Sequence, residues 1–344
     1  MISGNTVSLR PKYLLRLAFL GQGAIWASVF KRVEDIRYGR ALRSHPVPED
    51  PIFIIGHWRT GSTFLHQLMV KDPRFTAPTL FQVVQPDSFL TAYRYYRPIF
   101  LSVVSKRRPM DNVRIGMNEP QEDEYAIYRM TKYSPLEKLI FPREKKYFLS
   151  GMESYLPPDD LAQEWEDRLV QFFRKISFST GKRIVSKNPF NSLRIGTLLR
   201  LFPGARFIHI IRNPTNVVPS TINMWTIVQR QNCLNRNHHT PTVEEVCGVM
   251  GLINSRIREQ SQLLSPERFF EIRYEDLERD PIQELGRLYS FLDLPFTPEA
   301  EANVQQFLGE VAGYEKNKFN LTGEEQATIR TLTRSYLEQY EINP

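Results

Sequence analysis

Cysteine is scarce in this sequence. The chain has 2 cysteines among 344 residues, at positions 233 and 247. Two cysteines cannot form a disulfide framework, and no C-x-x-C pair indicates a zinc or redox site. The scarcity predicts a protein of a reducing compartment, and we expect a cytoplasmic location.

Uncharged stretches long enough to cross a bilayer are also missing. Residues 17–30 carry no charge, but a transmembrane helix needs about 20 apolar residues. We expect this segment to form a helix that packs on its own domain or on a partner subunit, so the protein could be a homo-oligomer. Two alternatives for the segment stay open. One is peripheral membrane contact through residues 13–30, with Phe19, Trp26 and Phe30 on the apolar side of an interfacial helix. The other is a secretory signal peptide with a poor cleavage site.

Blocks of one charge sign are absent too. The chain has 45 basic and 38 acidic residues and a net charge of +7, spread along the sequence rather than gathered in an arm. The surplus favours an anionic ligand or surface, whereas its even spread argues against a nucleic-acid partner.

Short runs rich in β-branched and aromatic residues predict buried strands at 52–55, 183–186, 206–211 and 269–274. They lie between helical patterns, which indicates a parallel sheet with helical crossovers and hence an α/β fold. We expect an N-terminal helical arm over residues 1–48 and a main domain over residues 49–344. Within that domain, residues 78–180 predict a mainly helical insertion suited to a substrate-binding cap.

A glycine-bracketed loop follows the first of these strands. Its sequence, Gly-His-Trp-Arg-Thr-Gly-Ser-Thr at 56–63, leads directly into an apolar helix. Such units bind phosphate, because glycines turn backbone N–H groups inward and the helix N-terminus attracts anions. The lysine of nucleoside-triphosphate hydrolases is missing, since Ser62 stands in its place. The loop predicts a phosphate site with Arg59 as its cation and with hydroxyl donors at Ser62 and Thr63.

A second anion site is expected at the end of the strand at 206–211. Arg212 leaves this strand at its carboxyl end, Pro214 suits the start of a helix, and Ser220 follows two turns later. A guanidinium binds phosphate through two parallel hydrogen bonds. These residues predict a phosphate site that is separate from the loop.

Four motifs together carry a family resemblance. They are the loop at 56–63, Ser-Lys-Asn-Pro-Phe at 186–190, the segment from Arg212 to Ser220, and Tyr-Glu-Asp-Leu at 274–277. Their order resembles that of sulfotransferases using 3′-phosphoadenosine 5′-phosphosulfate (PAPS), in the broad bacterial-type branch, and is distantly similar to tyrosylprotein sulfotransferases. The resemblance covers residues 50–320. It implies a three-layer fold like that of P-loop kinases, PAPS as donor, adenosine 3′,5′-bisphosphate (PAP) as product, and no metal.

The resemblance also implies roles for individual residues. Those holding the 5′-phosphosulfate would be Arg59, Thr60, Gly61, Ser62 and Thr63, and those holding the 3′-phosphate would be Arg212 and Ser220. Lys316 and Lys318 stand where relatives often have a basic loop that closes over the cofactor. Arg59 and Lys187 are the candidates to stabilise the leaving group.

The general base is expected after the phosphate loop. Gln82 stands where some relatives have glutamate, and an amide cannot take up a proton. We favour Glu122, in an acidic run after Pro120, which is suited to start a helix whose dipole lowers carboxyl pKa values. Ordinary capping by these carboxylates is the alternative. Further candidates are Glu119, Glu124, His57 and His66, and the pair at 238–239 is a candidate for acceptor contact.

The acceptor class stays open. Aromatic side chains of the insertion suit a lipophilic alcohol such as a sterol or phenol, a carbohydrate, or simply the core of a helical cap. We favour sulfuryl transfer to the hydroxyl of a small lipophilic acceptor. Two other classes stay open, namely a kinase-like nucleotide enzyme and a non-catalytic nucleotide-binding protein.

Overall fold

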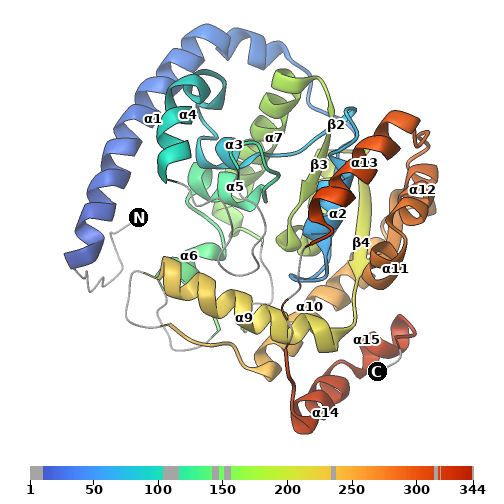
Figure 1. The fold of residues 1–344 in the computed structure, drawn as a ribbon. Helices are drawn as coiled ribbons and strands as arrows, with labels where there is room; N and C mark the ends of the chain where they lie inside the picture. The colour runs from blue at the N-terminus through green and yellow to red at the C-terminus, as the bar shows by residue number, and fades with distance from the viewer. Residues whose placement is uncertain are drawn as a thin grey trace.

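A five-stranded parallel sheet forms the centre of the fold (Figure 1). The computed structural model describes residues 11–103, 116–141, 147–150, 156–233, 238–313, 317 and 319–342. The strands lie in the order β2-β3-β1-β4-β5. They are β1 (Ile52–Ile55), β2 (Phe75–Thr76), β3 (Arg183–Lys187), β4 (Arg206–Ile211) and β5 (Phe269–Arg273). The predicted α/β fold with a central parallel sheet is confirmed.

Helices connect and surround these strands. Those before β3 are α1 (Pro11–Ser44), α2 (Ser62–Met69), α3 (Leu80–Val84), α4 (Phe89–Val103), α5 (Glu124–Thr131), α6 (Leu136–Ile140) and α7 (Asp159–Thr180). Those between β3 and β5 are η1 (Pro189–Leu193), α8 (Ile195–Leu201), α9 (Pro214–Asn232), α10 (Val243–Ser261) and η2 (Pro266–Arg268). After β5 follow α11 (Tyr274–Arg279), α12 (Pro281–Phe291), α13 (Pro298–Val311), α14 (Gly323–Leu332) and α15 (Arg334–Gln339).

The side chains of β1 alternate between two apolar layers. Successive residues of a strand point to opposite faces of the sheet, and all four residues of β1 are buried. Ile52 and Ile54 pack in one cluster with residues of α2, α12 and α13. Phe53 packs in another with residues of α7, α8 and α10. Helices thus cover both faces, which gives the three layers that the sequence predicts.

Some local predictions were wrong at their boundaries. The last strand ends at Arg273, because Tyr274 already begins α11. Pro120 does not start a helix, since it forms an isolated bridge with Thr79, and α5 begins later, at Glu124. The edge strand β2 was not predicted, because two residues are too few to show a period. The helix start at Pro214 is confirmed, with the Asn213 side chain accepting the N–H of Thr215.

The N-terminal helix lies along the insertion. α1 contacts α4 and α7 and runs down one edge of the molecule (Figure 1). Across the described ranges, every helix falls short of the length or the apolar character that a bilayer crossing requires.

Candidate functional site

The carboxyl ends of four strands bring the motif residues to one edge of the sheet. β1 lies between β3 and β4, and its Ile54 is in register with Lys187 on one side and Ile208 on the other. The chain therefore changes sides of the sheet at β1. Open parallel sheets bind ligands at the carboxyl edge beside such a switch point, and here that edge carries the glycine-bracketed loop.

The loop has the backbone shape of a phosphate cradle. Its φ angles are positive at Gly56 (135°), Arg59 (67°) and Gly61 (96°). A Cβ at Gly56 would lie 2.8 Å from the carbonyl oxygen of Ile210, so only glycine fits there. Gly61 is the N-cap of α2, and the helix has no side-chain cap. Its first N–H groups therefore have no side-chain acceptor at the cap, and an anion could accept from them.

Tyr274 packs directly on the loop. A Cβ added at Gly61 would lie 2.0 Å from Cδ2 of the Tyr274 ring, and the Tyr274 hydroxyl donates to Glu278 at 2.7 Å. The Tyr-Glu-Asp-Leu motif was noted in the sequence without a role for its tyrosine. Its first residue, which begins α11, supports the loop.

We expect Gly61→Ala to disable the loop. The new methyl group would meet the Tyr274 ring, and alanine at a positive φ costs about 1–2 kcal/mol in addition. PAP affinity should fall at least tenfold by calorimetry. Gly181→Ala is the matched control, because Gly181 also has a positive φ (64°) but open space around it. Unchanged PAP binding in Gly61→Ala would contradict the cradle.

Arg59, Arg212 and Ser220 form one continuous cationic cluster. The Nε of Arg59 donates to Oγ of Ser220 at 2.9 Å, and Nη1 of Arg212 donates to the backbone oxygen of Arg59 at 3.0 Å. Arg212 also lies over the Tyr274 ring, 4.1 Å from its centroid, and its buried Nε has no hydrogen-bond partner among the described residues. The Arg59 side chain therefore joins the loop to the predicted second anion site, a contact that the sequence did not indicate.

The remaining loop residues differ in how they can reach a ligand. The Thr60 hydroxyl donates to the carbonyl oxygen of His57 at 2.8 Å, so it shapes the loop instead of facing outward. Ser62 is buried and Thr63 is half-buried at the start of α2. Lys316 and Lys318 lie outside the described residues.

Lys187 and Glu122 meet at the end of β3. The Lys187 Nζ lies 2.5 Å from Oε1 of Glu122, and the two side chains are 7% and 17% exposed. Lys187 is therefore not a solvated strand end. Both residues were candidates from the sequence, but their pairing across 65 positions was not predicted. The site thus combines a carboxylate and an ammonium beside the phosphate loop.

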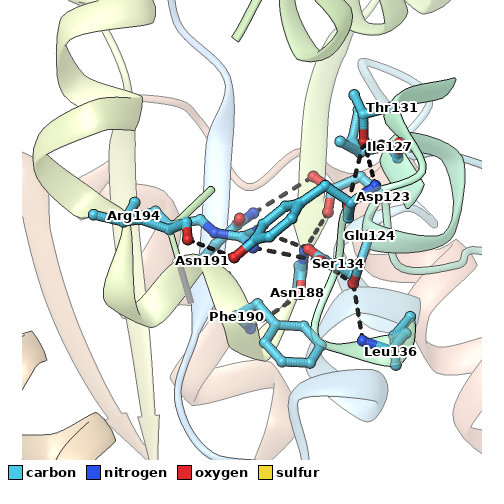
Figure 2. Close-up of polar contacts among 12 residues, drawn as sticks. Asp123, Glu124, Ile127, Thr131, Ser134, Leu136, Asn188, Phe190, Asn191 and Arg194 are labelled. Carbon is cyan, nitrogen blue, oxygen red and sulfur yellow. Dashed lines mark hydrogen bonds and ion pairs between the residues drawn. The ribbon is translucent and has the colours of Figure 1, made fainter. Parts of the chain in front are cut away.

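A buried polar network begins at Asp123, the residue after Glu122 (Figure 2). Asp123 accepts hydrogen bonds from Ser186 and Asn188, both at 2.6 Å. Burial raises the pKa of Asp123 above its usual range. The network therefore joins the start of α5 to the end of β3.

Glu124 belongs to the same network. It forms a fully buried ion pair with Arg194 at 2.6 Å and accepts from Ser134, also at 2.6 Å (Figure 2). Burial works to raise its pKa, but the charge and hydrogen bonds of Arg194 outweigh burial and lower it. Glu124 therefore has a structural position and does not serve as a free base. Arg194 was missed, because a single arginine in an apolar run gives no signal of its partner.

The loop histidine is neutral. Burial lowers the pKa of His57 to about 4. Its Nδ1 donates to the carbonyl oxygen of Trp58 at 2.8 Å, and its buried Nε2 has no partner among the described residues. His66 lies in the core, where burial lowers its pKa to about 3 and Nε2 donates to the carbonyl oxygen of Val185.

Within the described part of the chain, no group of three or more His, Cys, Asp or Glu side chains is arranged to hold a metal ion.

Sequence comparisons point to one family. The model of the family described as "Sulfotransferase family" matches residues 51–298. The omega-hydroxy-beta-dihydromenaquinone-9 sulfotransferase Stf3 of Mycobacterium bovis is 34% identical over 311 residues, which are 89% of this chain and 79% of the relative. Human carbohydrate sulfotransferase 5 is 31% identical over 297 residues, covering 75% of this chain and 67% of the relative.

Solved structures agree with these comparisons in fold. The sulfotransferase STF9 from Mycobacterium avium superposes with a TM-score of 0.67 at 20% identity, covering 91% of this chain and 82% of that one. STF1 from Mycobacterium tuberculosis gives a TM-score of 0.63 at 15% identity, with 96% and 88% covered. The three-layer arrangement around the parallel sheet is therefore shared with solved structures.

Proposed function

Because this chain belongs to the sulfotransferase family, we propose that the enzyme transfers a sulfuryl group from PAPS to the hydroxyl of a small lipophilic acceptor and releases PAP. The observation that carries the proposal is the Lys187–Glu122 pair, 2.5 Å apart at the carboxyl edge of the sheet. Lys187 ends β3, which pairs with β1, and the loop after β1 lacks the lysine of triphosphate hydrolases.

The loop and the cationic cluster fit the two ends of this donor. PAPS supplies an activated sulfuryl group on its 5′-phosphate and a second phosphate on its 3′ oxygen. The backbone of residues 59–63 and the N-terminus of α2 bind the 5′ end. Arg212, Ser220 and Arg59 bind the 3′-phosphate, and the Nε of Arg212, which has no hydrogen-bond partner among the described residues, gives its guanidinium a donor for this purpose.

Glu122 and Lys187 perform the chemistry of the acceptor and of the leaving group. The Glu122 carboxylate takes the proton of the acceptor hydroxyl, which makes its oxygen a better nucleophile. The Lys187 ammonium stabilises the negative charge that grows on the departing phosphate oxygen, as cations do in phosphoryl transfer. The hydrogen-bonded network beneath them keeps both groups in place, so little reorganisation is needed.

A lipophilic acceptor is supported by the name of one relative. The aromatic rings beside the loop belong to the apolar core, since Trp58, Phe190, Trp225 and Phe148 are at most 5% exposed. The relative that is 34% identical is named for a hydroxylated menaquinone, a lipid. A carbohydrate acceptor is the second candidate, because the human relative is named for one.

An acceptor panel tests this function directly. The enzyme is incubated with PAPS and with prenyl alcohols, sterols, phenols or oligosaccharides, and sulfated products are detected by mass spectrometry. We expect sulfated lipophilic alcohols. Products from oligosaccharides alone would favour the second candidate, whereas hydrolysis of ATP without any sulfated product would contradict both.

Arg212 gives a test of donor recognition. We expect Arg212→Gln to weaken PAP binding about 10- to 100-fold, since a hydrogen bond to a charged group contributes about 1.5–3 kcal/mol. Binding of AMP, which has no 3′-phosphate, should change little. Arg206→Gln, at the opposite end of β4, is the matched control. Equal losses for PAP and AMP in calorimetry would mean that Arg212 does not read the 3′-phosphate.

A further inference from the structure

The outer face of α1 is not used by the proposed chemistry. The inner face of this helix packs on the body of the protein. Phe30 contacts the rings of Tyr95 and Tyr96, with centroids 5.2 and 5.6 Å apart, and Glu34 forms a buried ion pair with Lys175 of α7. Figure 1 shows the helix along one edge of the molecule. Its opposite side is therefore turned to the surroundings.

Large hydrophobic residues gather on that opposite side. Ile25 is 68% exposed and Ile36 is 87% exposed. The exposed large hydrophobic residues of α1 are Ile25, Trp26, Val29, Val33 and Ile36, and we call them the exposed apolar stripe. At about 100° of rotation per residue, the stripe covers an arc of roughly 100° on the side of the helix away from Glu34. Phe30 lies one turn from Trp26, with ring centroids 6.4 Å apart, but packs against the body of the protein and does not belong to the stripe.

The same arc is basic toward its C-terminal end. Arg32, Arg40 and Arg43 are exposed there. The ion pairs of α1 among the described residues, Lys31–Asp87 and Glu34–Lys175, belong to its inner side. This helical face carries apolar residues followed by arginines without an ion-pair partner in the ranges that the structure describes. It is complementary to a surface whose interior is apolar and whose outer layer is negatively charged.

We propose that this stripe docks the protein onto an anionic lipid bilayer, with α1 lying in the plane of the surface. The apolar side chains enter the boundary between headgroups and acyl chains, as in interfacial amphipathic helices. Trp26 suits this boundary because its ring is apolar and its N–H is polar. The arginines contact lipid phosphates, and each strengthens binding by about fivefold near an anionic surface.

A second copy of the chain fits the stripe less well. Parallel pairing of two α1 helices would set the arginines of one copy against the same arginines of the other. Antiparallel pairing would set the apolar half of one stripe against the basic half of its partner. Both arrangements leave charges unpaired or repelling, whereas lipid phosphates neutralise them.

Vesicle co-sedimentation of the full chain tests the proposal. The vesicles contain phosphatidylcholine with or without phosphatidylglycerol, and no donor or acceptor is present. This readout keeps a failure of docking distinct from a failure of the proposed activity. We expect binding to the anionic vesicles, about tenfold or more weaker for Ile36→Asp, because a carboxylate cannot enter the apolar boundary. Leu263→Asp is the matched control, since Leu263 is a comparably exposed residue, at 61%, outside α1.

The charge of the stripe is tested separately. Replacing both Arg40 and Arg43 by glutamate should weaken binding to anionic vesicles by about 25-fold or more, while Arg330→Glu on α14 should have little effect. Equal binding to neutral and anionic vesicles, or equal losses in Ile36→Asp and Leu263→Asp, would overturn the proposal. A dimer in analytical ultracentrifugation that Ile36→Asp dissociates would assign the stripe to a contact between copies, and this too would overturn it.

Discussion

Replacing Glu122 by glutamine should lower the turnover number about 100- to 10,000-fold, the range that general-base catalysis contributes. The amide keeps the size of the side chain and can still contact Lys187, but it cannot take up the proton of the acceptor. PAP affinity should stay within a few-fold of the wild-type value, because the proposed function has Glu122 act on the acceptor and not on the donor. The turnover number at saturating PAPS and calorimetry with PAP measure the two effects.

Glu119→Gln is the control for this experiment. Glu119 lies in the same acidic run but outside the pair with Lys187 and outside the buried network, so its variant should retain activity. Undiminished turnover in Glu122→Gln would move the base to another group, and the neutral His57 would be the next to test. Parallel losses of turnover and PAP affinity would instead indicate a collapsed site.

The second large effect is a loss of stability, which we expect when Arg194 is replaced. Arg194→Met should lower the free energy of unfolding by about 3–5 kcal/mol, because it leaves a buried carboxylate without its counter-ion. The side chains of Arg194 and Glu124 are 0% and 1% exposed, so water cannot replace the lost partner. Urea unfolding followed by circular dichroism measures the change.

An exposed ion pair provides the comparison. Arg256→Gln breaks a surface pair with Glu259 and should cost at most about 1 kcal/mol. The double variant Arg194→Met/Glu124→Gln should be less destabilised than Arg194→Met alone, since it removes the stranded charge as well. A loss in Arg194→Met no larger than that in Arg256→Gln would contradict a structural role for the buried pair.

The sheet and the phosphate loop could be predicted from the sequence because both depend on local patterns. Four strands show as short runs rich in β-branched and aromatic residues, and the loop at 56–63 follows one of them directly. Contacts between segments that are distant in the chain leave no local pattern in the sequence. Glu122 meets Lys187, and Arg194 meets Glu124, through the packing of the insertion on the end of β3.

The orientation of individual side chains could not be predicted from the sequence either. Arg59 was expected at the 5′ end of the donor, and its hydrogen bond to Ser220, 161 positions away, could not be predicted from the loop sequence. Glu124 was a candidate base, and its position inside the fold depends on which residue of the acidic run begins α5. A shift of one or two residues at a helix start decides which carboxylate is buried.

The contact between Glu34 and Lys175 decides how far this chain can be shortened at its beginning. A version that starts at the connector after α1 would strand the Lys175 ammonium, with the carbonyl oxygen of Pro86 as its remaining hydrogen-bond acceptor. Engineers who want a smaller catalyst without the N-terminal helix would therefore have to replace this lysine by a neutral residue of similar length. Trimming alone would yield a protein that is harder to purify and store.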